Sequence, residues 1–252
     1  MNNKGQITLF VIVGILLVGA VIVFFAVFQQ RGIDIGLEQE FNPESFMDRC
    51  IRESTRKKID VMLPQGGFLS PSDYVKYDDS NVAYLCKNVN YYEPCIAQYP
   101  VYLTTLKQEL ESGIREDVES CFLELEDELE RRNYQVGGDE IEIKATLKPG
   151  SVEIVVYRDM QISREEESRN FEYFTSTIKS NLYDLGYTAN EIARQEAKYC
   201  YFEYLGFMLL YPEFDIRKYT LSDSTKIYTI IYKDSGDKMN VAIRGCAIPP
   251  GF

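Results

Sequence analysis

The residues of this chain whose type and number best indicate chemistry are its cysteines. There are six, an even number, and the chain has neither a histidine nor a Cys-x-x-Cys pair. Zinc and iron–sulfur sites are built from histidines or from closely spaced cysteines. The sequence therefore predicts three disulfides formed in an oxidising compartment, with free or metal-bound thiols as the alternative. The six are Cys50, Cys86, Cys95, Cys121, Cys200 and Cys246.

Side chains for acid–base or nucleophilic catalysis show no recognisable arrangement. Without histidine, Ser-His-Asp and Cys-His machinery is excluded, and no Gly-rich loop has the spacing that binds phosphate. One enzyme hypothesis is left, a hydrolase that uses two carboxylates, because glycoside hydrolysis needs only two and the chain has 39 acidic residues. No pattern marks which two would act. We therefore assign no catalytic residue, no cofactor and no metal ligand, and favour a protein that is not an enzyme.

The N-terminal region contains a long apolar run. Residues 7–28 carry no charge, and a helix of that length would span about 33 Å, which matches the hydrocarbon core of a bilayer. A cleavable secretory signal usually has a shorter apolar stretch, of about 7 to 15 residues. The run predicts a transmembrane helix at 7–28, after a leader at 1–6. A juxtamembrane linker at 29–41 and an extracytoplasmic domain at 42–252 would follow.

The charges around this run predict its orientation. Lys4 lies before the run, whereas Arg31, which lies after it, is soon followed by acidic residues. Basic residues favour the cytoplasmic side of a membrane, so we expect the N-terminus in the cytoplasm and the C-terminal domain outside. The expected localisation is the plasma membrane, as a single-pass protein.

The elements that position the first four cysteines are expected to be two helices with extended pieces between them. Asn42 is a good N-cap and Pro43 fits the first helical position, so a helix should start here and end at the Pro-Gln-Gly-Gly sequence. Residues 68–100 carry turn signals and short extended pieces. Apolar residues then recur every three or four positions through 102–133, which predicts a long amphipathic helix with a break near Gly113.

In the second half of the chain, the spacing at which apolar residues recur changes several times. Residues 140–147 and 151–159 alternate apolar and polar side chains and predict a β-hairpin, whereas residues 164–187 predict a helix. Thr188 and Glu191 have the spacing of a capping box, which would open a further helix. The apolar residues of that helix expected to face inward are Ile192, Tyr199, Leu205 and Leu209.

Three strand-like segments end the chain, at 215–221, 225–233 and 238–246, and an Asp-Ser-Gly-Asp turn joins the last two. Blocks of helices and antiparallel strands without regular βαβ spacing predict an α+β fold. The full expectation is an N-terminal transmembrane helix followed by an extracellular domain of amphipathic helices and antiparallel β-hairpins.

Six cysteines allow 15 pairings, from which these elements favour one. The favoured pairs are Cys50 with Cys121, Cys86 with Cys95, and Cys200 with Cys246. The first pair lies on the apolar faces of two helices, which a bridge would tie together. The second pair is nine residues apart across a proline-containing loop. The remaining pair would join the capped helix to the last strand.

Acidic residues dominate the expected external domain. Residues 33–252 contain 25 basic and 39 acidic side chains, a formal charge of −14. Such a surface repels nucleic acid and anionic headgroups, so we expect no nucleic-acid partner. A solvated surface is the ordinary explanation of this charge, and an acidic binding site is the alternative.

The sequence "KGQITLFVIVGILLVGAVIVFF", which starts at Lys4, gives the apolar run a further meaning. It resembles the class III signal sequence of archaeal type IV pilin-like and archaellin-like proteins, and the chain is also similar to uncharacterised single-pass archaeal surface proteins. The resemblance implies cleavage between Gly5 and Gln6, with the helix kept as an anchor or a filament core. Phe10 departs from the pattern, because pilins often place glutamate at this fifth mature position.

These observations favour a membrane-anchored cell-surface protein whose disulfide-stabilised external domain has a structural or binding role. The alternatives are a subunit or minor component of a type IV pilus-like filament, and an extracytoplasmic carboxylate hydrolase. The expected partners are the membrane and, through the N-terminal helix, copies of the chain in a homo-oligomer or filament.

Overall fold

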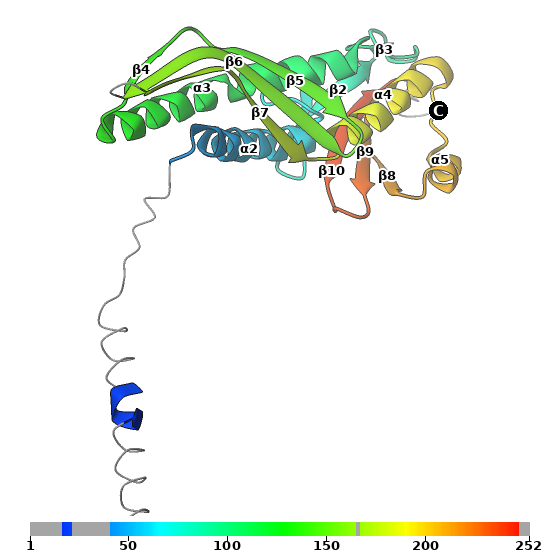
Figure 1. The fold of residues 1–252 in the computed structure, drawn as a ribbon. Coiled ribbons are helices and arrows are strands. Elements are labelled where there is room, and N and C mark those ends of the chain that lie inside the picture. Colours follow the sequence, from blue (N-terminus) through cyan, green and yellow to red (C-terminus); the bar gives the residue numbers. More distant parts are fainter. Residues whose placement is uncertain (1–16, 22–40, 165–166, 247–252) are drawn as a thin grey trace, which may run out of the picture. The chain divides into compact units, whose positions relative to one another are not determined.

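A computed structural model describes residues 17–21, 41–164 and 167–246 of the chain (Figure 1). The chain divides into two units, residues 1–42 and residues 43–252. Residues 17–21 are helical. All the elements named below belong to the second unit.

The described residues of the second unit form helices and two sheets. The helices are α2 (Pro43–Met62), α3 (Tyr102–Arg131), α4 (Leu182–Tyr199) and α5 (Tyr204–Leu210), and a 3₁₀ turn, η1 (Leu63–Gln65), follows α2. The strands of the first half are β1 (Tyr74–Tyr77), β2 (Ser80–Lys87), β3 (Ile96–Ala97), β4 (Gln135–Gly138) and β5 (Glu142–Lys148). Those of the second half are β6 (Ser151–Arg164), β7 (Glu167–Lys179), β8 (Phe214–Thr220), β9 (Lys226–Tyr232) and β10 (Lys238–Arg244).

One sheet is built around the long hairpin of β6 and β7. Along one edge of β6, β5 pairs with residues 151–157 and β4 pairs with residues 160–163, while β7 pairs along the other edge. All these pairs are antiparallel, and the register shifts between Tyr157 and Met160. In Figure 1 this sheet lies across α2 and α3, which contact β7 and β5. The sheet and the two helices therefore form two layers with a core between them.

The other sheet combines strands from the two ends of the second unit. Its order is β1-β2-β10-β9-β8, and the short β3 pairs with β2. β10 runs parallel to β2, with Ala242 opposite Tyr84, whereas the other pairs of this sheet are antiparallel. α4 packs on β2, β9 and β10, and α5 packs on the edge strand β8. This sheet therefore has its own covering helix.

The helix α3 is continuous through Gly113, where the sequence predicted a break. A Cβ atom at this position would overlap Cδ1 of Leu69, in the loop between η1 and β1. Glycine inside a helix costs about 1 kcal/mol relative to alanine, and here its hydrogen leaves room for the end of the Leu69 side chain. The buried residues of the helix recur at spacings of three and four, as the sequence predicted.

The helix predicted for residues 164–187 is wrong. Residues 167–179 are strand β7, and only from Leu182 is the chain helical. Along β7 the buried Phe174, Ser176 and Ile178 alternate with exposed residues, which is the period of a strand. β-Branched and aromatic residues favour this conformation, and pairing along the whole of β6 supplies the partner that the local sequence does not reveal.

The capping box predicted at Thr188 and Glu191 is also wrong. Thr188 lies inside α4, where its side chain is 1 % exposed and its hydroxyl donates a hydrogen bond to the carbonyl of Asp184 at 2.9 Å. Of the residues expected to face inward, Ile192 is buried. The other three face outward: Tyr199 is 62 % exposed, Leu205 is 57 % exposed and Leu209 is 85 % exposed.

The predicted fold class needs correction in two respects, although the second unit is α+β. In the described part of the chain no helix is long and apolar enough to cross a membrane. The other residues of the predicted span, 7–16 and 22–28, lie outside the described residues. The sheets are also not purely antiparallel, because the β2–β10 pair makes one of them mixed.

Candidate functional site

Three disulfides cross-link the second unit. Cys50–Cys121 links α2 to α3, and Cys86–Cys95 links β2 to the loop before β3. Cys200–Cys246 links the end of α4 to the end of β10. These are the pairs that the sequence analysis favoured, and no cysteine is left free. Cys200 lies one residue beyond α4 with a φ of 58°, whereas the sequence placed it inside a helix. The candidate disulfide residues thus form a framework in which two bridges are neighbours, because Gly245, which precedes Cys246, lies against Cys95.

A buried carboxylate lies beside the last of these disulfides. The side chain of Glu196 in α4 is 1 % exposed. One of its oxygens, Oε1, accepts a hydrogen bond from the hydroxyl of Tyr228, and Oε2 lies 2.5 Å from Nζ of Lys226. The same ammonium donates a hydrogen bond to the carbonyl of Cys200 at 2.7 Å. Burial, followed by the hydrogen bond to Glu196, raises the pKa of Tyr228.

This cluster has a structural role, because both oxygens of the carboxylate are engaged by protein groups. The cluster ties α4 to β9. It also holds the carbonyl of Cys200, the disulfide-bonded residue whose backbone has the left-handed conformation. Glu196 was not among the residues predicted from the sequence, yet a signal was present. Glu196 lies one helical turn after Ile192 and therefore on the buried face of its helix.

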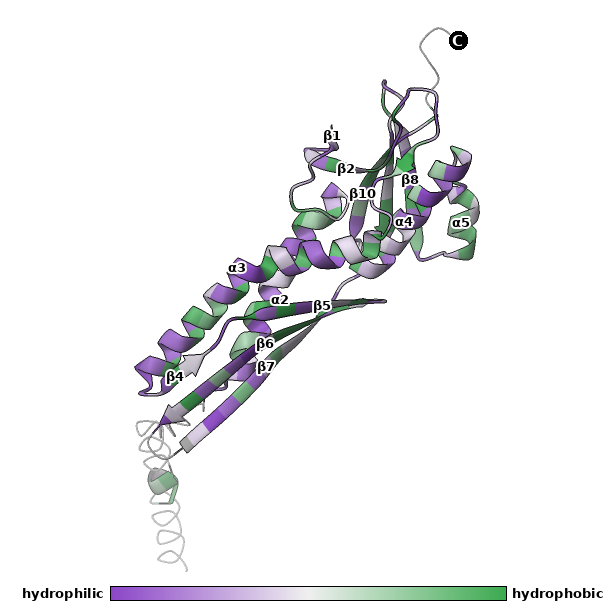
Figure 2. Cartoon of the chain, turned by 90° about the horizontal axis from the view of Figure 1, so that it is seen from above, coloured by the Kyte–Doolittle hydropathy of each residue, from purple (hydrophilic) through white to green (hydrophobic). Residues whose placement is uncertain are grey.

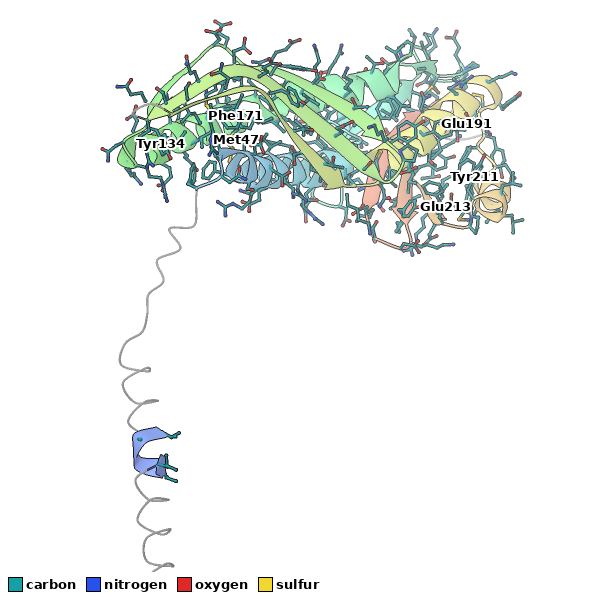
Figure 3. The ribbon with its side chains drawn as sticks, viewed as in Figure 1. Met47, Tyr134, Phe171, Glu191, Tyr211 and Glu213 are labelled. Atoms are coloured by element: carbon teal, nitrogen blue, oxygen red, sulfur yellow. A yellow bond between two sulfur atoms is a disulfide. The ribbon has the colours of Figure 1, made fainter. Side chains whose placement is uncertain are left out.

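A groove runs between β7 and the first two turns of α2. Its volume is about 590 Å³, and one wall consists of the consecutive residues 170–175 of β7. The opposite wall is formed by Glu44, Ser45 and Asp48 of α2. Figure 3 labels Phe171 of β7 and Met47, a buried residue of α2, and these two elements contact each other. A strand edge that faces a helix across an open groove is an arrangement in which proteins bind extended peptides.

Two aromatic residues of the groove lining contact each other, and one hydrogen bond joins strand and helix beside the groove. The rings of Phe171 and Phe174 stack with their centroids 5.5 Å apart. Phe174 packs edge-on against Phe122 of α3, which anchors it in the core. At the end of the groove the hydroxyl of Ser176 donates a hydrogen bond to the carbonyl of Asp48 at 3.3 Å, so strand and helix are tied there.

Three carboxylates line the groove, those of Glu44, Asp48 and Glu172. Arg52, one turn along α2, lies 2.6 Å from one oxygen of Asp48 and offsets part of this charge. Glu172 is exposed on the strand wall.

A second surface of interest is the short helix α5, which has no buried residue. Leu205, Leu209 and Leu210 are 57, 85 and 78 % exposed, and Figure 2 colours this helix as hydrophobic. Glu203 caps the helix by accepting a hydrogen bond from the Gly206 amide at 3.3 Å. Two hydrogen bonds lower the pKa of the Glu203 carboxyl. The one from the hydroxyl of Tyr201 has the larger effect, and the one from the Gly206 amide adds to it.

Comparison of the chain with protein-family models, with curated proteins and with solved structures finds no match. The residues expected to flank a processing site, Gly5 and Gln6, lie outside the described residues. The disulfides, the buried cluster and the groove are therefore the features from which a function can be argued.

Proposed function

We propose that residues 43–246 form an extracytoplasmic domain of the cell surface with a structural or binding role, stabilised by disulfides. The observation that carries the proposal is the complete pairing of all six cysteines in three disulfides. Disulfides persist in oxidising compartments and are rare in the cytosol, where thiols are kept reduced.

The arrangement of acidic groups supports binding rather than catalysis. The one acidic side chain buried in the described residues is that of Glu196, and it is held by Tyr228 and Lys226. A general acid or base needs a free position beside the reacting group. The groove along β7, in contrast, is open and has the volume of an ordinary ligand site.

Thiol labelling of native protein tests the compartment. Protein from intact cells is denatured in the presence of a maleimide reagent, with and without prior reduction, and its mass is measured. We expect no labelled cysteine without reduction and six after reduction. Labelling of all six cysteines without reduction would overturn the proposal.

Protease added to intact cells gives an independent test of exposure. We expect the second unit to be cleaved from intact cells, with a cytoplasmic marker protein protected as the control. Protection until the cells are lysed would contradict an external location even if the cysteines were oxidised.

A further inference from the structure

We propose that a pocket between α2, the end of β7 and the turn before β10 binds a small zwitterion, a free α-amino acid, between basic and acidic side chains. This inference rests on the binding role proposed above and gives it a ligand class. The pocket is separate from the groove beside the first turns of α2, because the two share no lining residue.

The pocket lies where the two sheets of the second unit meet. One side is formed by α2 and by Ile178 and Lys179 of β7, and another by Ser235 and Asp237 of the turn between β9 and β10. Ile59 and Ile178, which are 3 and 2 % exposed, give it an apolar part. Its volume is about 190 Å³. At about 15 to 30 Å³ per water-sized atom, it holds a ligand of about six to twelve non-hydrogen atoms, which is the size of a small amino acid.

Charged side chains of both signs line this pocket without pairing. Arg56 and Asp60 lie one turn apart on α2, a spacing at which such side chains commonly form an ion pair. Neither they nor Lys179 makes an ion pair or a side-chain hydrogen bond with the part of the chain that the structure describes. Four residues of helix rise about 6 Å, which leaves room for the two charges of one amino acid between Arg56 and Asp60. These charges are therefore available to a ligand.

A buried amide positions a further acidic group. Asn181, which is 7 % exposed, donates one hydrogen bond to Oδ2 of Asp237 at 2.9 Å and another to the hydroxyl of Ser235 at 2.8 Å. The backbone amide of Asp237 also donates to this hydroxyl, at 3.1 Å. The turn between β9 and β10 is thereby held against the start of α4, with the Asp237 carboxylate in the lining of the pocket.

The combination of charges selects the ligand. An inorganic anion would face Asp60 and Asp237, and a metal ion would face Arg56 and Lys179. Among the described residues no group of three or more acidic or cysteine side chains could hold a metal ion either. A zwitterion avoids both conflicts, because its carboxylate pairs with the two basic side chains and its ammonium with the two acidic ones. The apolar part of the pocket then receives a small side chain.

The test uses the full-length protein in detergent micelles and equilibrium dialysis against radiolabelled glycine, L-alanine, L-serine and L-valine, each alone. We expect saturable binding of at least one of them, at one molecule per chain, which weakens as salt is raised. Absence of saturable binding for all four would overturn the proposal.

Blocked forms of the bound amino acid distinguish a zwitterion site from simple charge attraction. The N-acetyl derivative keeps the carboxylate, and the amide derivative keeps the ammonium. Each should compete about tenfold more weakly than the amino acid, because each loses one set of charged hydrogen bonds. Equal competition by either derivative would contradict the proposal.

Two variants test the named side chains. Lys179→Gln removes a partner of the carboxylate and Asp60→Asn removes a partner of the ammonium, so each should weaken binding about tenfold. The matched controls make the same changes at exposed positions outside the pocket lining, Lys57→Gln on α2 and Asp127→Asn on α3. They should change the affinity by less than about twofold, since long-range charge effects are screened. Controls that weaken binding as much as the pocket variants would reject this site.

The preference between ligand forms shows whether the two variants act locally. Both replaced side chains are exposed, so the melting temperature should stay the same. In Lys179→Gln the amino acid should lose part of its advantage over its amide, and in Asp60→Asn part of its advantage over its N-acetyl form. Unchanged preferences in both variants would refute the proposed pairing of charges.

Thiol labelling separates this proposal from the one on which it rests. If the cysteines are oxidised while the binding tests fail, only the pocket proposal falls. If labelling shows six free thiols, the extracytoplasmic proposal falls, and the dialysis experiments alone decide the pocket.

Discussion

Removal of the Cys50–Cys121 disulfide should destabilise the second unit more than removal of the Cys86–Cys95 disulfide. The first pair is separated by 71 residues in sequence and the second by 9. The loss of unfolded-state entropy grows with the logarithm of the closed loop, which gives about 4.4 kcal/mol for the long loop and about 2.6 kcal/mol for the short one. The difference of about 1.8 kcal/mol corresponds to about 4 to 7 °C in the melting temperature of a unit of this size.

The variants to compare are the two double substitutions to alanine, each measured without reductant by calorimetry and by urea unfolding. Cys86, Cys95 and Cys121 are 0, 4 and 1 % exposed and Cys50 is partly buried, so the long-loop variant loses no more buried side-chain surface than the short-loop variant. The comparison therefore isolates loop length. If the short-loop variant melts at the same or a lower temperature than the long-loop variant, the loop-entropy reasoning is refuted.

Three further changes have defined expected outcomes. Glu196→Gln should lower the free energy of unfolding in urea by about 3 kcal/mol, because it leaves the Lys226 ammonium without its carboxylate in a largely buried site; a loss below about 1 kcal/mol would contradict this. Burial raises the pKa of Tyr102 in the folded chain, so its stabilising effect is complete below about pH 10 and is lost as the pH rises further. Tyr102→Phe should therefore make the alkaline fall in unfolding free energy shallower by about 1.4 kcal/mol per pH unit, as followed by circular dichroism, and an unchanged slope would reject this assignment. Gly67→Ala should lower the melting temperature more than Gly150→Ala: both glycines have positive φ, at 85° and 70°, but only at Gly67 would a Cβ atom overlap a neighbouring side chain. Equal effects would show that the backbone conformation alone sets the cost.

The sequence predicts helices α2 and α3 well because each carries its own evidence. Pro43 marks the start of α2, and the buried residues of both helices recur at helical spacing. The disulfide between them could be inferred for the same reason, since Cys50 and Cys121 lie on those apolar faces. The local spacing of apolar residues was sufficient here, because the position of a residue around its own helix decides whether its side chain is buried.

The strand β7 could not be predicted in the same way. The acidic residues around Glu167 resemble a helix start, and no glycine or proline marks a turn between β6 and β7. The strand conformation comes from pairing with β6 over its whole length. The groove follows from this pairing and from the packing of α2, which lies more than a hundred residues earlier in the sequence. Its existence therefore depends on tertiary structure that no local pattern encodes.

The parallel pairing of β2 with β10 determines the order in which the chain can fold. β10 lies between β2 and β9 in its sheet, yet it is the last strand in sequence among the described residues. Until it is synthesised, β2 lacks this neighbour, and the pairing then closes a loop that contains α3, the sheet of β4–β7 and α4. Such high contact order slows folding and prolongs the exposure of apolar strand edges. A nascent chain that stops before Lys238 would keep that edge open, so chaperone retention and aggregation of incomplete chains are the expected consequences.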